Sequence, residues 1–159
     1  MIGAVAFAAT ACTSTGTAIT TPFDTVPPVL QHGPVDEVKE IGVTGLGTVL
    51  ADGQGLTLYM FANDRRGTPS RCYQICAVQW PPLVLTAGTT RPIAGPGVRT
   101  SLLGTAPRAD GTTQITYNGW PLYLWPPDRV PGKATGQALT NAGGRWYVLR
   151  PDGQPLITP

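Results

Sequence analysis

The chain has 159 residues, of which 13% are charged, while glycine (20) and proline (17) are abundant. This composition excludes a helical bundle and a highly charged disordered chain, and it is typical of a turn-rich β protein. From residue 42 onward there are ten basic residues, nine of them arginine, against five acidic ones. Such a surface either favours anionic lipid or cell-wall phosphate, or is simply solvated. No basic run alternates with aromatic residues, so we expect no nucleic-acid partner.

The first twelve residues, MIGAVAFAATAC, form an apolar run that is too short to span a bilayer and that ends in small residues and Cys12. The run resembles a bacterial lipobox, in which Cys12 would accept the lipid, although Ala9 stands where leucine is usual and no basic residue precedes the run. An ordinary secretory signal cut nearby, with Cys12 incidental, is the alternative. We expect residues 1–12 to be the signal and residues 13–41, rich in proline and threonine, to be a flexible tether.

Residues 42–159 are expected to form the folded domain, because strand signals recur there between turn signals. Hairpin turns are predicted at Asp52-Gly53, at Asn118-Gly119 and at Pro151-Asp152-Gly153. Asn118-Gly119 suits a type I′ turn, which needs positive φ at both central residues. No window of useful length has a 3.6-residue period, so the fold class is predicted to be all-β, a small antiparallel sandwich or barrel.

The domain contains an internal repeat, with a first copy over about 42–90 and a second over about 105–159. LTLYMFANDRRG in the first copy corresponds to WPLYLWPPDRVPG in the second, and each stretch leads through a loop to a segment that begins with tryptophan. Self-similarity of this kind predicts two related units that bury a shared core.

The shared pattern is Tyr-x-aromatic-x-x-Asp, and its aromatic residues and its aspartates each allow two interpretations. The aromatic side chains occupy alternate positions, so each pair lies on one side of its strand, either in the core or as an exposed row that grips sugar rings or a partner. The aspartates either close turns by accepting backbone N–H bonds or pairing with arginine, or converge on one ligand or cation. Trp80 precedes Pro81 and Pro82, which predict an edge strand or a rim loop. The candidate binding residues are Tyr59, Phe61, Asp64, Trp80, Tyr123, Trp125 and Asp128.

Cys72 and Cys76 remain as an even pair if Cys12 is lipidated, and in an oxidising compartment we expect them to form a disulfide. Because the loop between them is very short, the disulfide should stabilise the local turn by about 2 kcal/mol. Metal binding is less favoured, since a zinc site wants four soft ligands and the domain offers no histidine and no third cysteine.

These residues resemble the bacterial secreted repeat of unknown function, a group of predicted lipoproteins with a Tyr-x-(Phe/Trp/Tyr)-x-x-Asp motif. The resemblance covers nearly all of residues 45–155 and includes both copies of the motif, the cysteine pair and Trp80-Pro81-Pro82. The loop Arg65–Ser70 and Gln74 between the cysteines depart from the usual pattern. The resemblance implies a secreted or lipid-anchored bacterial protein and supplies no established activity.

An enzyme is not expected, because the chain from residue 42 onward has no histidine and no glutamate, and its five aspartates all adjoin turn signals. We therefore assign no catalytic residue, metal or cofactor. The predicted function is a non-catalytic cell-envelope lipoprotein module that binds a partner protein or a cell-wall polymer, outside the cytoplasm. Lipidated Cys12 would anchor it to the outer face of the cytoplasmic membrane; without the lipid it would be secreted. The alternative is a thiol–disulfide or electron-transfer accessory protein that uses Cys72 and Cys76.

Overall fold

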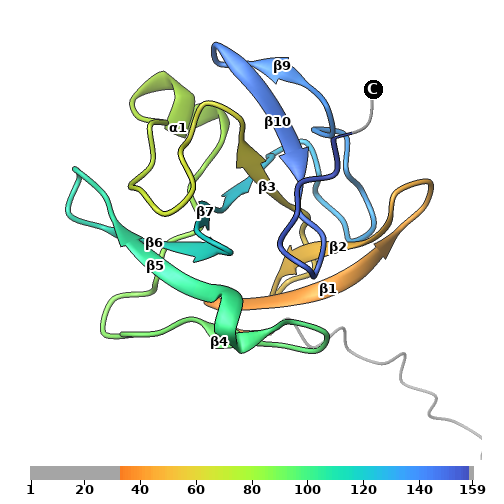
Figure 1. Cartoon of the computed structure of the whole chain (residues 1–159), viewed down its shortest axis with the longest axis horizontal. Helices are drawn as coiled ribbons and strands as arrows, with labels where there is room; N and C mark the ends of the chain where they lie inside the picture. The colour runs from red at the N-terminus through yellow and green to blue at the C-terminus, as the bar shows by residue number, and fades with distance from the viewer. Residues whose placement is uncertain (1–32, 158–159) are drawn as a thin grey trace, which may run out of the picture.

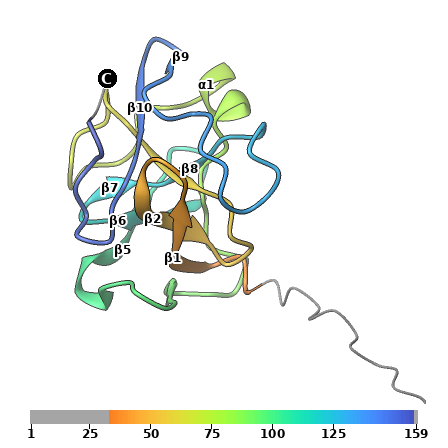
Figure 2. The same cartoon turned by 90° about the vertical axis from the view of Figure 1, so that its right-hand side faces the viewer.

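The computed structural model describes residues 33–157 (Figures 1 and 2). The predicted signal segment, Cys12 and residues 13–32 of the predicted tether lie outside the described residues. No helix between residues 33 and 157 has the length and apolar character needed to cross a membrane.

The described residues are mostly strands with one short α-helix, so the all-β prediction is confirmed. In chain order they form β1 (Glu37–Val43), β2 (Gly47–Asp52), β3 (Leu58–Phe61), α1 (Ile75–Gln79), β4 (Ile93–Ala94), the 3-10 helix η1 (Thr100–Leu102), β5 (Leu103–Pro107), β6 (Thr113–Tyr117), β7 (Trp120–Pro121), β8 (Tyr123–Leu124), β9 (Thr140–Asn141) and β10 (Gly144–Val148). Three small sheets have the orders β2-β1-β4, β8-β3-β10-β9 and β5-β6-β7, and none of the three closes on itself within this part of the chain.

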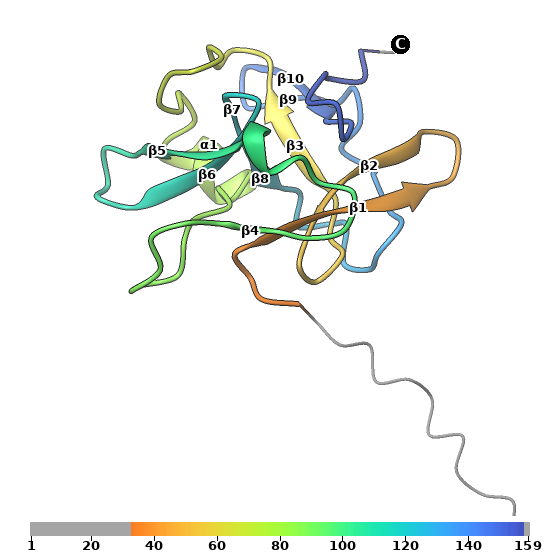
Figure 3. The same ribbon diagram turned by 60° about the horizontal axis from the view of Figure 1, so that its bottom comes forward.

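The folded domain begins earlier than predicted, because Glu37–Val43 form β1 rather than the end of a tether. β1 pairs antiparallel with β2 over six residue pairs and carries the short parallel strand β4 on its other side (Figure 3). Val38 and Val43 are buried, whereas the charged residues of this strand, Glu37, Lys39 and Glu40, have more exposed side chains. The proline- and threonine-rich composition of residues 13–41 predicted a flexible tether, but the two buried valines of β1 fix this end of the segment to the domain.

The predicted hairpin turns are present. Asn118 and Gly119 have φ of 50° and 78°, as a type I′ turn requires, and they join the antiparallel strands β6 and β7. Asp52 Oδ1 accepts the backbone N–H groups of Gln54 and Leu56, which closes the turn between β2 and β3. Gly153, with φ of 80°, closes the last turn by donating its N–H to the carbonyl of Arg150.

The two repeats interlock rather than lying side by side. β3 of the first repeat lies between β8 and β10, both from the second repeat, and it pairs antiparallel with each. In this register Tyr59 is directly opposite Tyr123, so the two motif tyrosines are neighbours across the β3–β8 pair. A strand that is hydrogen-bonded on both edges by the other repeat predicts that neither repeat folds independently.

Two core clusters lie on opposite faces of the β3–β10 pair. Side chains alternate along a strand, so Tyr59 and Phe61 enter one cluster while Leu58 and Met60 enter the other. β10 alternates in the same way, with Trp146 and Val148 in the first cluster and Tyr147 in the second. The cluster that holds Tyr59 also holds both cysteines, Trp80 and Tyr123. The motif residues therefore meet inside this cluster, which we call the aromatic core.

Candidate functional site

The two motif tyrosines bind the two motif aspartates in a crossed arrangement. Tyr59 of the first repeat donates a 2.5 Å hydrogen bond from its hydroxyl to Asp128 Oδ2 in the second repeat. Tyr123 of the second repeat donates a 2.7 Å bond to Asp64 Oδ2 in the first. Exchanging the two repeats converts one contact into the other. We call these contacts the crossed Tyr–Asp pairs.

The second oxygen of each aspartate fixes the loop that follows it in the chain. Asp64 Oδ1 accepts the backbone N–H of Arg71 at 2.7 Å, and Asp128 Oδ1 accepts the N–H of Thr135 at 3.0 Å. In both loops the donor N–H lies seven positions after the aspartate, so each loop is wider than an Asx turn. Thr135 Oγ1 adds a 2.6 Å bond to Asp128. The predicted backbone N–H bonds are present, but neither carboxylate forms an ion pair within residues 33–157, where the ion pair is Arg108–Asp110.

Each tyrosine hydroxyl also accepts a hydrogen bond, so it is both a donor and an acceptor. Ser70 Oγ lies 2.6 Å from the Tyr123 oxygen. A phenol has one proton, which Tyr123 gives to the acceptor-only carboxylate, so the serine hydroxyl is the donor here. At the other pair the backbone N–H of Gly136 donates to the Tyr59 oxygen at 3.2 Å.

Burial sets the electrostatics of the crossed Tyr–Asp pairs. Asp64 is 5% exposed and Asp128 is 2% exposed, and both tyrosines are fully buried. Burial raises the pKa of Asp64, although hydrogen bonds from Tyr123 and from the Arg71 N–H oppose the shift. Burial, together with the facing carboxylate, also raises the pKa of Tyr59 and of Tyr123 well above the usual tyrosine value. Both phenols therefore stay protonated and remain donors to the aspartates.

Four aromatic rings stack through the middle of the aromatic core. Trp80 and Trp146 lie at the centre, with ring centroids 3.9 Å apart and planes 4° from parallel. Phe61 stacks on the outer face of Trp146 at 4.3 Å, and Trp125 stacks on the outer face of Trp80 at 4.2 Å. The stack has the same symmetry between the repeats as the crossed pairs, because each outer ring covers the tryptophan of the other repeat.

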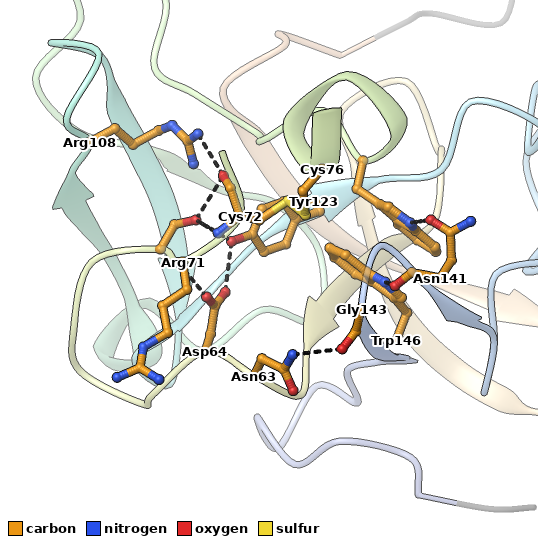
Figure 4. The surroundings of a disulfide bond; sticks show 12 residues. Asn63, Asp64, Arg71, Cys72, Cys76, Arg108, Tyr123, Asn141, Gly143 and Trp146 are labelled. Atoms are coloured by element: carbon orange, nitrogen blue, oxygen red, sulfur yellow. Dashed lines mark hydrogen bonds between the residues drawn. A yellow bond between two sulfur atoms is a disulfide. The ribbon is translucent and has the colours of Figure 1, made fainter. Parts of the chain in front are cut away.

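The motif tyrosines meet the stack edge-on. Tyr59 contacts Trp80 at 5.3 Å and Tyr123 contacts Trp146 at 5.1 Å, each in a T-shaped geometry within its own repeat. Such edge-to-face contacts are the favoured geometry for aromatic pairs. Asn141 bonds to both tryptophans, since its side-chain oxygen accepts from the Trp80 indole and its backbone oxygen accepts from the Trp146 indole (Figure 4).

The core interpretation of the motif aromatics is confirmed for Tyr59, Phe61 and Tyr123, which are at most 3% exposed. Trp125 is only half-buried, at the outer end of the stack. Trp80 is fully buried and follows α1 directly, while Pro82 after it forms an isolated bridge with Tyr123 at the edge of the sheet. The alternative of an exposed aromatic row does not hold for the tyrosines and phenylalanine.

The cysteine pair forms a disulfide beside the crossed pair of Tyr123 and Asp64 (Figure 4). Both cysteines are buried, and Cys76 lies in the single turn of α1. The Cys72 N–H donates to Ser70 Oγ at 2.9 Å, which connects the disulfide loop to the Tyr123 hydroxyl through one serine. Arg108 Nη2 donates to the Cys72 carbonyl at 3.0 Å from the other side.

Four residues of this site were not anticipated from the sequence: Ser70, Arg108, Gly136 and Asn141. Only Gly136 had a usable signal, because it stands eight positions after Asp128, as Cys72 stands eight positions after Asp64. A side chain at Gly136 would lie 2.7 Å from Trp80 and 3.0 Å from Tyr59, so the backbone of the second repeat approaches where only glycine fits. The other three gave no such signal, because their contacts to Tyr123, to the Cys72 carbonyl and to Trp80 join residues 36 to 61 positions apart.

A family described as a secreted repeat of unknown function matches residues 41–84 and 104–150. The two matches together cover more than half of the chain. The chain belongs to this family. The secreted-repeat family thus accounts for both copies, and each copy contributes one tyrosine and one aspartate to the crossed Tyr–Asp pairs and one of the two central tryptophans to the stack. No curated protein and no solved structure matches the chain.

The two secreted repeats share one site rather than carrying one site each. A single copy holds an aspartate without the tyrosine that binds it and a tryptophan without its stacking partner. The motif residues therefore join the repeats to one another. In each copy the carboxylate stands five residues after the tyrosine of the aromatic strand.

Proposed function

We propose that this protein is a non-catalytic cell-envelope lipoprotein whose two-repeat domain binds a partner protein or a cell-wall polymer. Cys12 would carry the lipid and hold the protein at the outer face of the cytoplasmic membrane. The observation that carries the proposal is the complete use of the motif carboxylates: every oxygen of Asp64 and Asp128 accepts a hydrogen bond from the protein itself. The residues that define the family therefore support a non-catalytic scaffold.

The remaining aspartates of the domain support the same conclusion. A general base must have an oxygen within hydrogen-bond reach of the proton that it abstracts. Asp52, Asp110 and Asp152 each accept the N–H of a residue two positions ahead, so each is a turn-closing residue. From residue 42 onward there is no histidine or glutamate, so the five aspartates are the acid–base groups of that stretch near neutral pH, and the beginning of the domain adds Asp36, Glu37 and Glu40.

The environment of the disulfide favours a stabilising role over a redox role. Cys72 is fully buried and Cys76 is 9% exposed, while a thiolate–disulfide exchange needs access to one sulfur. Thiol trapping of the full chain in graded redox buffers tests this directly. We expect a reduction potential below about −300 mV, as for structural disulfides. A potential near or above about −200 mV would favour the alternative of a redox accessory protein.

Localisation and binding are tested in a bacterial host that processes lipoproteins. The full chain should partition with the membrane fraction, and Cys12→Ser should release it into the medium. Reversible cross-linking before solubilisation should then recover a specific envelope component with the wild-type chain. Membrane association that survives Cys12→Ser would contradict the lipid anchor. Cross-linking that recovers no envelope component would contradict the binding function.

A further inference from the structure

Three arginines surround the 3-10 helix η1, in hollows whose linings include none of the crossed Tyr–Asp pairs and none of the stacked rings. Arg66, Arg99 and Arg150 are all exposed. None of them has a carboxylate partner within residues 33–157, where the ion pair joins Arg108 to Asp110. We call these two hollows together the η1 surface.

The first hollow lies between η1 and the C-terminal turn, and it holds two of the three arginines. Its lining residues include Arg99, Arg150 and Asp152, with Leu46 and Thr48 from the β1–β2 hairpin. The backbone N–H of Arg99 donates to the Tyr117 hydroxyl at 3.0 Å, and that hydroxyl donates to the Pro151 carbonyl at 2.8 Å. One buried tyrosine thus holds the backbones beside both arginines in place.

The second hollow lies on the other side of η1. It is lined by Arg66, Gly67, Ser101, Leu102, Asn118 and Gly119. Arg66 Nε donates to the Asn118 carbonyl at 2.6 Å, and its Nη2 donates to the Asn118 side-chain oxygen. These acceptors are neutral, so the guanidinium is held in position while its positive charge is not neutralised.

The consecutive residues Tyr117 and Asn118 connect the two hollows through hydrogen bonds. Tyr117 connects η1 to the C-terminal turn in the first hollow. Asn118 Nδ2 donates to the Gly153 carbonyl of that same turn at 3.0 Å, while Asn118 faces the second hollow. Figure 1 shows η1 as the short green coil beside the dark-blue C-terminal turn. Three arginines from three distant segments therefore lie along one continuous surface.

The charge of the η1 surface is positive. Asp152 is the acidic residue among those that line the two hollows, and its Oδ1 already accepts the N–H of Gln154. Three guanidinium groups against one carboxylate leave a net positive charge, in shallow hollows whose other polar linings include Thr48 and Ser101. A guanidinium presents donors in a planar fork that matches phosphate oxygens.

We infer that the η1 surface binds the phosphodiester groups of a linear, anionic cell-wall polymer. The inference rests on the proposed function and specifies its ligand. A membrane-binding surface would combine basic residues with strongly exposed apolar ones. The three most exposed large apolar side chains in the described part of the chain are Val78, Ile157 and Ile75, and none of them lines either hollow. Val78 and Ile75 lie on α1, whereas Ile157 follows Leu156 of the first hollow as a single apolar side chain. A chain of regularly spaced phosphates, in contrast, can place one group in each hollow.

The test measures binding of soluble poly(glycerol phosphate) to the full chain carrying Cys12→Ser, by fluorescence anisotropy at two salt concentrations. We expect Arg99→Glu/Arg150→Glu to weaken binding at least about tenfold, because charge reversal turns attraction into repulsion. Arg66→Glu should weaken it further. Arg129→Glu is the matched control, since Arg129 is exposed but lines neither hollow. Circular dichroism and the melting temperature confirm folding, and Arg99→Gln/Arg150→Gln provides a milder second variant.

Four outcomes would overturn the inference. An equal loss in Arg129→Glu would show that net charge, and not the η1 surface, attracts the polymer. Arginine-dependent binding to phosphatidylglycerol vesicles, with polymer binding unaffected, would assign the surface to a membrane. If the arginine variants retain binding to isolated cell envelopes, the proposed function stands and the η1 surface is not its site. If the unmodified chain binds no envelope component, the proposed function fails together with this inference.

Discussion

The hydroxyl of Tyr123 donates a 2.7 Å hydrogen bond to Asp64, a residue 59 positions away in the other repeat. The reciprocal bond from Tyr59 to Asp128 spans 69 positions. Each bond places a carboxylate that has little contact with solvent opposite a neutral donor, which offsets part of the cost of removing that charge from water. The crossed Tyr–Asp pairs are thus long-range contacts on which the association of the two repeats depends.

Removing one hydroxyl should therefore weaken the whole domain. We expect Tyr59→Phe and Tyr123→Phe each to lower the free energy of unfolding by about 2 kcal/mol, because the buried aspartate loses a donor. Urea unfolding followed by tryptophan fluorescence measures the change. Tyr73→Phe is the matched control, since its hydroxyl accepts only an exposed bond from the Ala109 N–H. A loss in Tyr73→Phe as large as in the other two would contradict the special role of the crossed pairs.

Because β3 lies between two strands of the second repeat, we expect neither repeat to fold unless the other is present. If the chain is divided after Gly88, in an exposed turn, β3 is separated from both β8 and β10. We expect neither 1–88 nor 89–159 to unfold cooperatively alone, whereas an equimolar mixture should. Proton–nitrogen NMR spectra of the halves and of their mixture measure this.

A chain cleaved after Gly88 once it has folded is the control for the two separate halves, because it should keep the native spectrum. Cooperative unfolding of either isolated half would show that a single repeat is a folding unit. It would also show that the β3–β8 and β3–β10 pairs are dispensable.

Gly136 is a position where one methyl group should be costly. Its backbone lies against Trp80 and Tyr59, and an added Cβ would come within 2.7 Å of the Trp80 ring. We expect Gly136→Ala to lower the free energy of unfolding by about 1–3 kcal/mol, the usual cost of overpacking. Gly42→Ala is the control, because a Cβ there would meet nothing within 4 Å. If both variants unfold at the same urea concentration as the wild type, the close approach at Gly136 is not energetically important.

Local features of the fold could be predicted from the sequence because their causes are local. Asn118 and Gly119 accept positive φ, which selects the type I′ turn wherever the chain is placed. The all-β class and the disulfide followed from turn spacing and from an even cysteine pair. The start of β1 was missed because its two valines stand at the end of a proline- and threonine-rich segment, whose composition predicted a tether as far as residue 41.

The site itself could not be predicted, since it depends on strand register between the repeats. Either tyrosine is chemically suited to either aspartate, and only the antiparallel pairing of Tyr59 with Tyr123 decides that the partners cross. The stacking of Trp80 on Trp146 depends on the same register. Sequence patterns indicate which residues face one side of a strand, but they do not indicate which strand lies next to it.

The raised pKa of Asp64 gives the domain a pH dependence of definite sign. Burial lifts this pKa above its ordinary value of 3.8, so the folded protein holds the proton more tightly than the unfolded chain does. The contribution of Asp64 to the free energy of unfolding is fully present below pH 3.8. It is lost as the pH rises through the pKa of Asp64 in the folded state. Burial raises the pKa of Asp52 as well, and it adds an effect of the same sign.

Asp110 acts in the opposite direction, because hydrogen bonds from Thr112 lower its pKa to about 2. The stabilisation from Asp110 is lost as the pH falls from 3.8 toward that value. The free energy of unfolding should therefore decline above about pH 4 because of Asp64 and Asp52, and below about pH 4 because of Asp110. Urea unfolding between pH 2 and pH 7 measures both limbs. Asp64→Asn should flatten the decline above pH 4 and leave the acid limb unchanged. A decline above pH 4 that persists undiminished in Asp64→Asn would assign it to another group, with Asp52 the first to examine.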